Sequence, residues 1–148
     1  MAELKVTSSA FSNMQALPEK HTCKALTNPP LSISGIPPAA KSLVLIVDDP
    51  DAPSGVWNHW LIWNIKPSSK IDEASVPAGA IQGKNDYGNN EYFGPCPPSG
   101  STHRYFFRVY ALDTLLSLPE GATRMQLNSA MNGHILAEGE LIGIYGRK

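Results

Sequence analysis

Length, composition and charge limit the classes of protein to which this chain can belong. It has 148 residues, a formal net charge of -1 and 17% charged side chains. This length suits one domain with an ordinary hydrophobic core. The sparse and balanced charge gives no basic face for nucleic acid. Thirteen prolines and twelve glycines favour short strands joined by shaped turns over a helical fold.

Targeting and redox signals are weak. Residues 1–14 lack a basic segment followed by an apolar run, and no apolar stretch approaches the roughly 20 residues that span a bilayer. We therefore expect a cytoplasmic protein with no integral membrane association. Cys23 and Cys96 are too few and too far apart for a disulfide scaffold or a CxxC motif.

Two apolar runs predict buried strands in the first half of the chain. Residues 42–48 are rich in Leu, Val and Ile and are bounded by proline-bearing segments. Residues 59–65 are apolar on both faces, which predicts a central strand that is covered on each side. Strict alternation places Trp60 and Ile62 on one face, with Leu61, Trp63 and Ile65 on the other.

The second half of the chain predicts a strand, a helix and a final strand. Residues 103–112 alternate between two faces: His103, Tyr105, Phe107 and Val109 on one, and Arg104, Phe106, Arg108 and Tyr110 on the other. Thr123 and Gln126 have the spacing of a capping box, and Gly133 is a plausible stop. The apolar side of this helix is expected from Met125, Ala130 and Met131. A last strand follows at about 136–145.

This order of elements predicts an all-β fold with one minor helix. Short strands, long shaped loops and little helix favour an antiparallel β-sandwich over alternating βαβ units. No repeat or linker divides the chain, so we expect a single domain over 1–148.

The most informative feature is a pair of proline-bearing loops, 49–58 and 94–102, which lead into His59 and His103. The connection between the first two strands has about ten residues, which suits an antiparallel pair and is short for a parallel crossover. We therefore expect Asp49 beside His59, where the carboxylate raises the pKa of the imidazole. A cationic histidine near loop N–H groups is a receptor for phosphate or carboxylate.

The same residues also have a purely structural interpretation. Asp and Pro in 49–53 are good turn residues, and a histidine at the start of a strand commonly fills a structural place. The repetition of proline loop, histidine and aromatic strand favours a functional site.

These motifs resemble the phosphatidylethanolamine-binding proteins, also called Raf kinase inhibitor proteins, in their short bacterial and archaeal branch. Residues 49–53 with Trp57 and His59 resemble the first signature of the family, and 94–98 followed by 103–105 resemble the second. Further similarity lies at 22–23, 28–31, 131–137 and 140–145.

The resemblance implies a PEBP-like β-sandwich with an anion pocket at one end of the large sheet. His59 and His103 would be the anion donors, Asp49 would orient them, and the ligand would be phosphate, a carboxylate or a phosphoethanolamine-like lipid head group. No cofactor is implied. The pocket residues that the resemblance implies are Asp49, Asp51, Trp57, His59, Gly94, Cys96, Pro97, His103 and Tyr105. The chain stops at Lys148, before the C-terminal helix of the eukaryotic members, so kinase inhibition has no specific support.

Three classes of function stay open. We expect a non-catalytic, regulatory anion-binding module. The alternative is a docking protein that inhibits or regulates a serine protease or a kinase. The third is an enzyme, with Cys96 as a thiolate nucleophile or a metal held by Asp49, Asp51 and His59. A homodimer is compatible with each of these.

Overall fold

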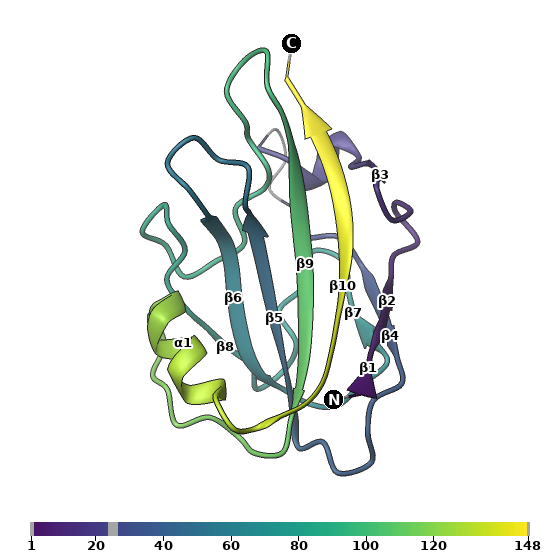
Figure 1. The fold of residues 1–148 in the computed structure, drawn as a ribbon, viewed down its shortest axis with the longest axis vertical. Coiled ribbons are helices and arrows are strands. Elements are labelled where there is room, and N and C mark those ends of the chain that lie inside the picture. Colours follow the sequence, from purple (N-terminus) through teal and green to yellow (C-terminus); the bar gives the residue numbers. More distant parts are fainter. Residues whose placement is uncertain (1, 24–26, 148) are drawn as a thin grey trace.

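The computed structural model describes residues 2–23 and 27–147, which form two β-sheets packed face to face with one short α-helix on the outer side (Figure 1). The large sheet has the strand order β1-β10-β9-β5-β6-β8, with β3 also paired to β10, and the small sheet has the order β2-β4-β7. The short elements are β1 (Ala2–Glu3), β2 (Lys5–Thr7), β3 (Gln15–Ala16), η1 (Glu19–His21), β4 (Leu31–Ser34), β7 (Lys70–Ile71) and β8 (Ile81–Gln82). The sandwich predicted from the sequence is confirmed.

The centre of the large sheet is antiparallel. Strand β5 (Ser42–Asp49) pairs with β6 (Trp57–Ile65) on one side and with β9 (Thr102–Leu112) on the other. Strand β10 (Ile135–Gly146) continues the sheet beyond β9. Each predicted strand therefore exists and extends slightly past its expected bounds. Among the strands of the described residues, only the two-residue strands β1 and β3 run parallel to β10.

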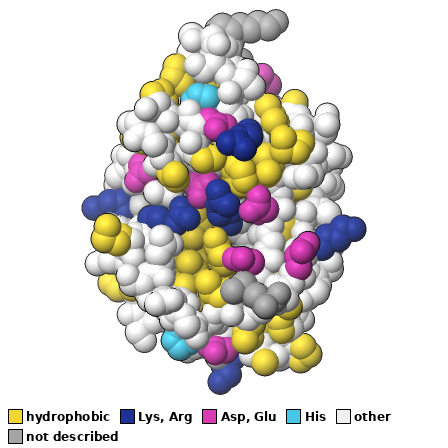
Figure 2. All heavy atoms as spheres, viewed as in Figure 1, with side chains coloured by type: hydrophobic (Ala, Val, Ile, Leu, Met, Phe, Trp, Pro, Cys, Tyr) yellow, Lys and Arg dark blue, Asp and Glu magenta, His cyan; other side chains and the backbone are white. Residues whose placement is uncertain are grey.

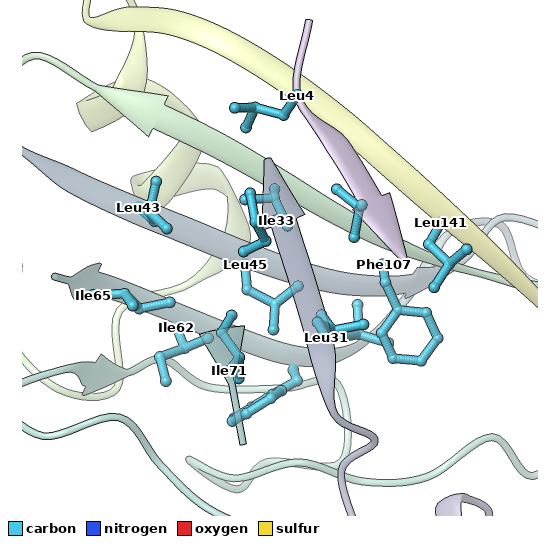
Figure 3. Close-up of a cluster of buried hydrophobic side chains, with 14 of the residues drawn as sticks. Leu4, Leu31, Ile33, Leu43, Leu45, Ile62, Ile65, Ile71, Phe107 and Leu141 are labelled. Atoms are coloured by element: carbon cyan, nitrogen blue, oxygen red, sulfur yellow. The ribbon is translucent and has the colours of Figure 1, made fainter. Parts of the chain in front are cut away.

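The main hydrophobic core lies between the two sheets (Figure 3). Leu31 and Ile33 of β4 meet Leu43 and Leu45 of β5 there, and Phe107 of β9 packs beside them. A second cluster lies on the outer side of the large sheet, under the helix. It contains Val44, Ile46, Leu61, Trp63, Leu112, Leu116, Ala122, Leu127 and Met131. Strands β5 and β6 are thus covered on both faces, as their continuous apolar runs predict.

The alternation predicted for β6 breaks at one residue. Ile65 was expected to share a face with Leu61 and Trp63, but it packs in the main core with Ile62. The register explains the error, because Leu43 and Leu45 pair with Ile65 and Ile62, so β6 contains one extra residue. Asn64 has a φ of 56° at this bulge. Asparagine tolerates that conformation, and the extra residue moves Ile65 to the other face.

Helix α1 (Arg124–Met131) begins at the expected capping box. Thr123 accepts a hydrogen bond from the Gln126 backbone N–H, and the Gln126 side chain accepts one from the Thr123 backbone. The expected apolar side is partly wrong, because Met125 is 79% exposed. Ala130 and Met131 face the sheet as expected, and Leu127 joins them in place of Met125. No helix in the described part of the chain is long and apolar enough to cross a bilayer.

The outer face of the large sheet carries paired charges beside exposed apolar groups (Figure 2). The buried Asp48 carboxylate accepts hydrogen bonds from Arg108 Nε at 2.9 Å and Arg124 Nη1 at 3.0 Å. The guanidinium groups of Arg104 and Arg108 lie over the Phe106 ring. These contacts confirm that Arg104, Phe106 and Arg108 share one face of β9, as their alternation predicts. They also join α1 to the sheet through its first residue.

Candidate functional site

A small cavity lies at the end of the large sheet where β5 ends and where β6 and β9 begin. The loops before β6 and before β9 rise at this end (Figure 1). The cavity has a volume of about 240 Å³. This is below the roughly 300–1,000 Å³ typical of sites for drug-sized ligands. It is lined by Asp49, Ala52, Pro53, Ser54, Trp57, His59, Tyr87, Cys96, Pro97, Pro98, His103 and Tyr105.

Asp49 is the partner of His103. The His103 Nδ1 lies 2.7 Å from Asp49 Oδ2, and both side chains are buried. The other carboxylate oxygen of Asp49 accepts a hydrogen bond from the Asp51 backbone N–H at 2.8 Å. Asp49 is therefore held from two directions, and it fixes the orientation of the His103 ring in the cavity wall. The expected orienting role of Asp49 applies to this histidine.

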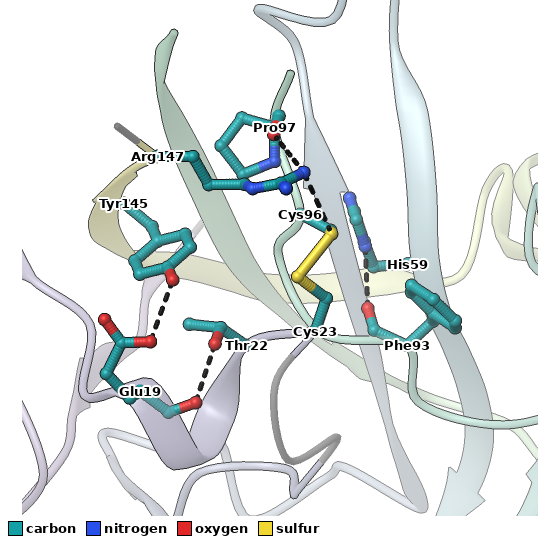
Figure 4. Close-up of a disulfide and its surroundings, with 9 residues drawn as sticks. All are labelled: Glu19, Thr22, Cys23, His59, Phe93, Cys96, Pro97, Tyr145 and Arg147. Atoms are coloured by element: carbon teal, nitrogen blue, oxygen red, sulfur yellow. Dashed lines mark hydrogen bonds between the residues drawn. A yellow bond between two sulfur atoms is a disulfide. The ribbon is translucent and has the colours of Figure 1, made fainter. Parts of the chain in front are cut away.

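His59 is held by a different group from the one that the sequence predicts. Its Nδ1 lies 2.6 Å from the backbone oxygen of Phe93, and the Phe93 N–H donates to the His59 carbonyl at 3.0 Å (Figure 4). The expectation of a raised pKa is wrong. Burial lowers the pKa of His59, and this effect exceeds the opposite effects of the Phe93 carbonyl and the nearby Asp49. In the ladder between β5 and β6, Asp49 pairs with Trp57 and not with His59. The Asp49 carboxylate contacts His103 of β9 instead.

Aromatic rings form most of one wall. The rings of Tyr87 and Phe93 stack with centroids 3.8 Å apart, and Trp57 meets Tyr87 edge-on at 5.3 Å. His59 also contacts Tyr105 edge-on at 5.5 Å. Burial raises the pKa of both Tyr87 and Tyr105, so both hydroxyls keep their protons at neutral pH. The wall is thus apolar apart from a few hydrogen-bonding atoms.

Asp51 and Gly94 do not line the cavity, contrary to expectation. The Asp51 carboxylate accepts hydrogen bonds from Arg104 Nε and Nη2, each at 2.9 Å. These bonds from Arg104 lower the pKa of Asp51 to about 2. Gly94 lies against the backbone of Thr22, where a Cβ atom would fall 2.6 Å from the Thr22 carbonyl oxygen. Both residues fix the loops that surround the cavity.

The two cysteines form a disulfide with each other, a bond that was not expected from two cysteines judged too few and too far apart for a disulfide scaffold (Figure 4). Their Cα atoms are 5.1 Å apart although 73 residues separate them in sequence. Cys96 lines the cavity, so the bond ties the cavity wall to the segment after η1. A free Cys96 thiolate, the nucleophile of the enzyme alternative, is therefore not present in this structure.

The structure brings together seven of the nine expected site residues and adds five others. Tyr87 is the most important residue that sequence reasoning missed. It lies in a polar turn segment outside both proline-bearing loops, and its one signal was an aromatic side chain in an otherwise polar stretch. The other additions are Ala52, Pro53, Ser54 and Pro98.

Other candidate sites are less suited to a ligand. The set proposed for a metal is separated, because Asp51 pairs with Arg104 and His59 with Phe93. Within the described ranges, no group of three or more His, Cys, Asp or Glu side chains could hold a metal ion. A larger cavity of about 680 Å³ runs along β2 and β10. We favour the smaller cavity as a site because two oriented imidazole rings converge on it, whereas the larger one is a groove between strands.

Comparison with known proteins places this site in a family. A family model described as phosphatidylethanolamine-binding protein matches residues 7–146. A UPF0098 protein of Pyrococcus abyssi is 51% identical, with 99% of this chain and 87% of that protein covered. The crystal structure of a phosphatidylethanolamine-binding protein homologue from Chlamydia trachomatis has a TM-score of 0.93 at 44% identity, with both chains fully covered. That of Escherichia coli YbcL, described as a member of the mammalian family, has a TM-score of 0.92 at 31% identity, covering 99% of this chain and 100% of YbcL. The chain therefore belongs to the phosphatidylethanolamine-binding protein family.

Proposed function

We propose that this protein binds a small anion, such as phosphate or a phosphoethanolamine-like head group, in the cavity between the two proline-bearing loops. The observation that carries the proposal is the convergence of His59 and His103 on one small cavity, each with its Nδ1 already held by the protein. A fixed ring has one free nitrogen for a ligand and loses little orientational freedom on binding.

The surroundings of the two rings support this function. Trp57, Tyr87 and the prolines 53, 97 and 98 limit the access of water, which strengthens polar interactions inside the cavity. The small volume suits a head group or a free anion better than a large organic molecule.

The role that we propose is binding, not catalysis. Both cysteines are engaged in the disulfide, so neither offers the free thiolate that the cysteine-dependent form of the enzyme alternative requires. A regulatory role, docking on a protease or kinase, lipid binding and a homodimer remain predictions that follow from the family. The cytoplasmic location also remains a prediction. The disulfide argues against it, because such bonds are most common in oxidising compartments.

A two-dimensional NMR titration with phosphate and phosphoethanolamine tests the proposal. We expect saturable shifts at 49–59 and 94–105 in the wild type and their loss in His59→Ala and His103→Ala. The matched control is His134→Ala, because His134 is exposed, pairs with Asp113 at 2.8 Å and does not line the cavity. The absence of shifts at millimolar ligand would contradict anion binding and leave protein docking as the better hypothesis.

A further inference from the structure

The Cys23–Cys96 disulfide lies where a reductant can reach it. Both cysteines are partly exposed, and Cys96 lies between Pro95 and Pro97 in the wall of the cavity. A chain of 148 residues with two buried apolar clusters does not depend on a covalent cross-link to fold. Exposed disulfides are also exchanged more readily than buried ones. The position of this bond therefore suits thiol–disulfide chemistry as well as stability.

The two segments that the disulfide joins also hold each other by non-covalent contacts. The Cys23 N–H donates to the Pro95 carbonyl at 3.0 Å. Gly94 lies so close to Thr22 that a Cβ atom would fall 2.4 Å from the Thr22 carbonyl carbon. Thr22 Oγ1 in turn donates to the Glu19 carbonyl at 2.6 Å (Figure 4). We therefore expect the reduced protein to keep its fold, with the two sulfur atoms close together.

A guanidinium group lies beside one of the two sulfur atoms. Arg147 Nη1 is 3.8 Å from Cys96 Sγ and donates to the Pro97 carbonyl at 3.2 Å (Figure 4). The Arg147 backbone is also fixed, because it accepts from the N–H of residue 100 at 2.8 Å and donates to the carbonyl of residue 101 at 3.1 Å. A nearby cation stabilises a thiolate relative to a thiol. Arg147 therefore makes Cys96 the better leaving group when the bond opens.

We propose that Cys23–Cys96 is a redox-active disulfide that a dithiol reduces in the folded protein, and that its reduction weakens anion binding in the cavity. A thiolate of the reductant attacks Cys23 Sγ, the S–S bond breaks, and Cys96 leaves as a thiolate with the electron pair of that bond. The second thiol of the reductant attacks the mixed disulfide and releases Cys23, so the dithiol is oxidised to a disulfide. Of the two protons that the dithiol gives up, one passes to Cys23 and the other to solvent.

The released thiolate changes the charge of the cavity wall. Cys96 lines the same cavity as His59 and His103, the two rings that we propose as anion donors. Asp49 already places a carboxylate in this wall, 2.7 Å from His103. The charge of Arg147 is present in both redox states, so reduction adds one net negative charge, which repels an incoming anion. The oxidised form is thus the binding form. This step rests on the proposed anion-binding function and names its regulation.

A trapping experiment on the native protein tests the exchange. The probe is a thioredoxin whose second active-site cysteine is replaced by serine, so that the mixed disulfide persists. We expect the adduct on Cys23, located by peptide mass mapping, in a protein whose amide NMR spectrum stays that of a folded chain. In Arg147→Gln the adduct should form about threefold more slowly, because Cys96 becomes a poorer leaving group. Lys66→Gln is the matched control, because Lys66 is exposed and does not line the cavity.

Two results of this experiment would overturn the exchange. One is an adduct that forms only in urea, which would make the disulfide purely structural. The other is an adduct on Cys96, or an equal rate in Arg147→Gln and the wild type, which would remove the role of Arg147. Neither result involves an anion, so both leave the proposed function intact.

Phosphate titrations of the oxidised and reduced wild type, followed by NMR, test the effect on binding. We expect the reduced form to bind at least about fivefold more weakly, as like charges partly screened by water repel. Cys23→Ser leaves Cys96 as a free thiolate, so it should lose more affinity than Cys96→Ser, which lacks the bond but has no thiolate in the wall. Equal losses in the two variants would overturn the effect of charge.

The outcomes separate this inference from the proposed function. Equal phosphate affinity of the oxidised and reduced forms overturns the redox control and leaves anion binding intact. Binding of phosphate by neither form overturns both. If either serine variant does not fold, the comparison of the two redox states of the wild type decides the question alone.

Discussion

Removal of the Cys23–Cys96 disulfide should lower the free energy of unfolding substantially. The bond joins residues 73 positions apart, and the loss of loop entropy in the unfolded chain corresponds to about 4 kcal/mol for a loop of this length. Neighbouring contacts survive the removal, including the hydrogen bond from the Cys23 N–H to the Pro95 carbonyl at 3.0 Å. We therefore expect a loss of about 2–4 kcal/mol in Cys23→Ser/Cys96→Ser, within the range typical of native disulfides.

Urea unfolding followed by tryptophan fluorescence measures this loss. At roughly 2–4 °C per kcal/mol for a chain of this size, the melting temperature should fall by about 5–15 °C. Either single Ser variant should lose about as much as the double variant, because each removes the same bond. Wild type in dithiothreitol is the matched control and should behave like the double variant. A loss below about 1 kcal/mol, with an unchanged m-value, would refute the loop-entropy reasoning.

Three further predictions concern the residues that hold the cavity loops. Gly94→Ala should lower the free energy of unfolding by about 1–3 kcal/mol in urea titrations, because its Cβ atom would meet the Thr22 backbone. Asp51→Asn should cost less than about 1 kcal/mol at pH 7, because its pair with Arg104 is partly exposed. That cost should disappear as the pH falls from the ordinary pKa of Asp towards about 2, which is the lowered pKa of Asp51 in the folded protein. Unfolding curves recorded across this pH range measure the change. Stability should also fall as the pH drops below about 6.5, because the unfolded chain protonates His59 more readily than the folded protein does.

Each of these predictions has an outcome that contradicts it. Wild-type stability in Gly94→Ala would mean that the loop can move away from Thr22 without loss. A cost for Asp51→Asn that persists at pH 2 would show that the Arg104 contact does not depend on the carboxylate charge. For His59, the slope of stability against pH between 7.5 and 5.5 should be smaller in His59→Gln than in the wild type. Equal slopes would remove His59 as the titrating group.

Much of the fold follows from local patterns in the sequence. The apolar runs of β5 and β6 and the alternation in β9 predict strands because side chains on a strand point to opposite faces in turn. The capping box at Thr123 predicts the start of α1 because its two hydrogen bonds join residues only three apart. Asn64 shows the limit of such patterns, because a single bulge moved Ile65 to the other core.

The cavity shows the same division between local and long-range information. The sequence by itself determined that Asp49 and His59 lie at one end of the sheet, because they flank a hairpin connection, and hairpin pairing is a local property. That the second proline-bearing loop and His103 lie there too was implied by the family resemblance. Only the tertiary structure decided that Asp49 binds His103, that Phe93 holds His59 and that Cys23 meets Cys96. These contacts join segments 34 to 73 residues apart. Their formation depends on the register between strands and the paths of loops, which no local pattern encodes.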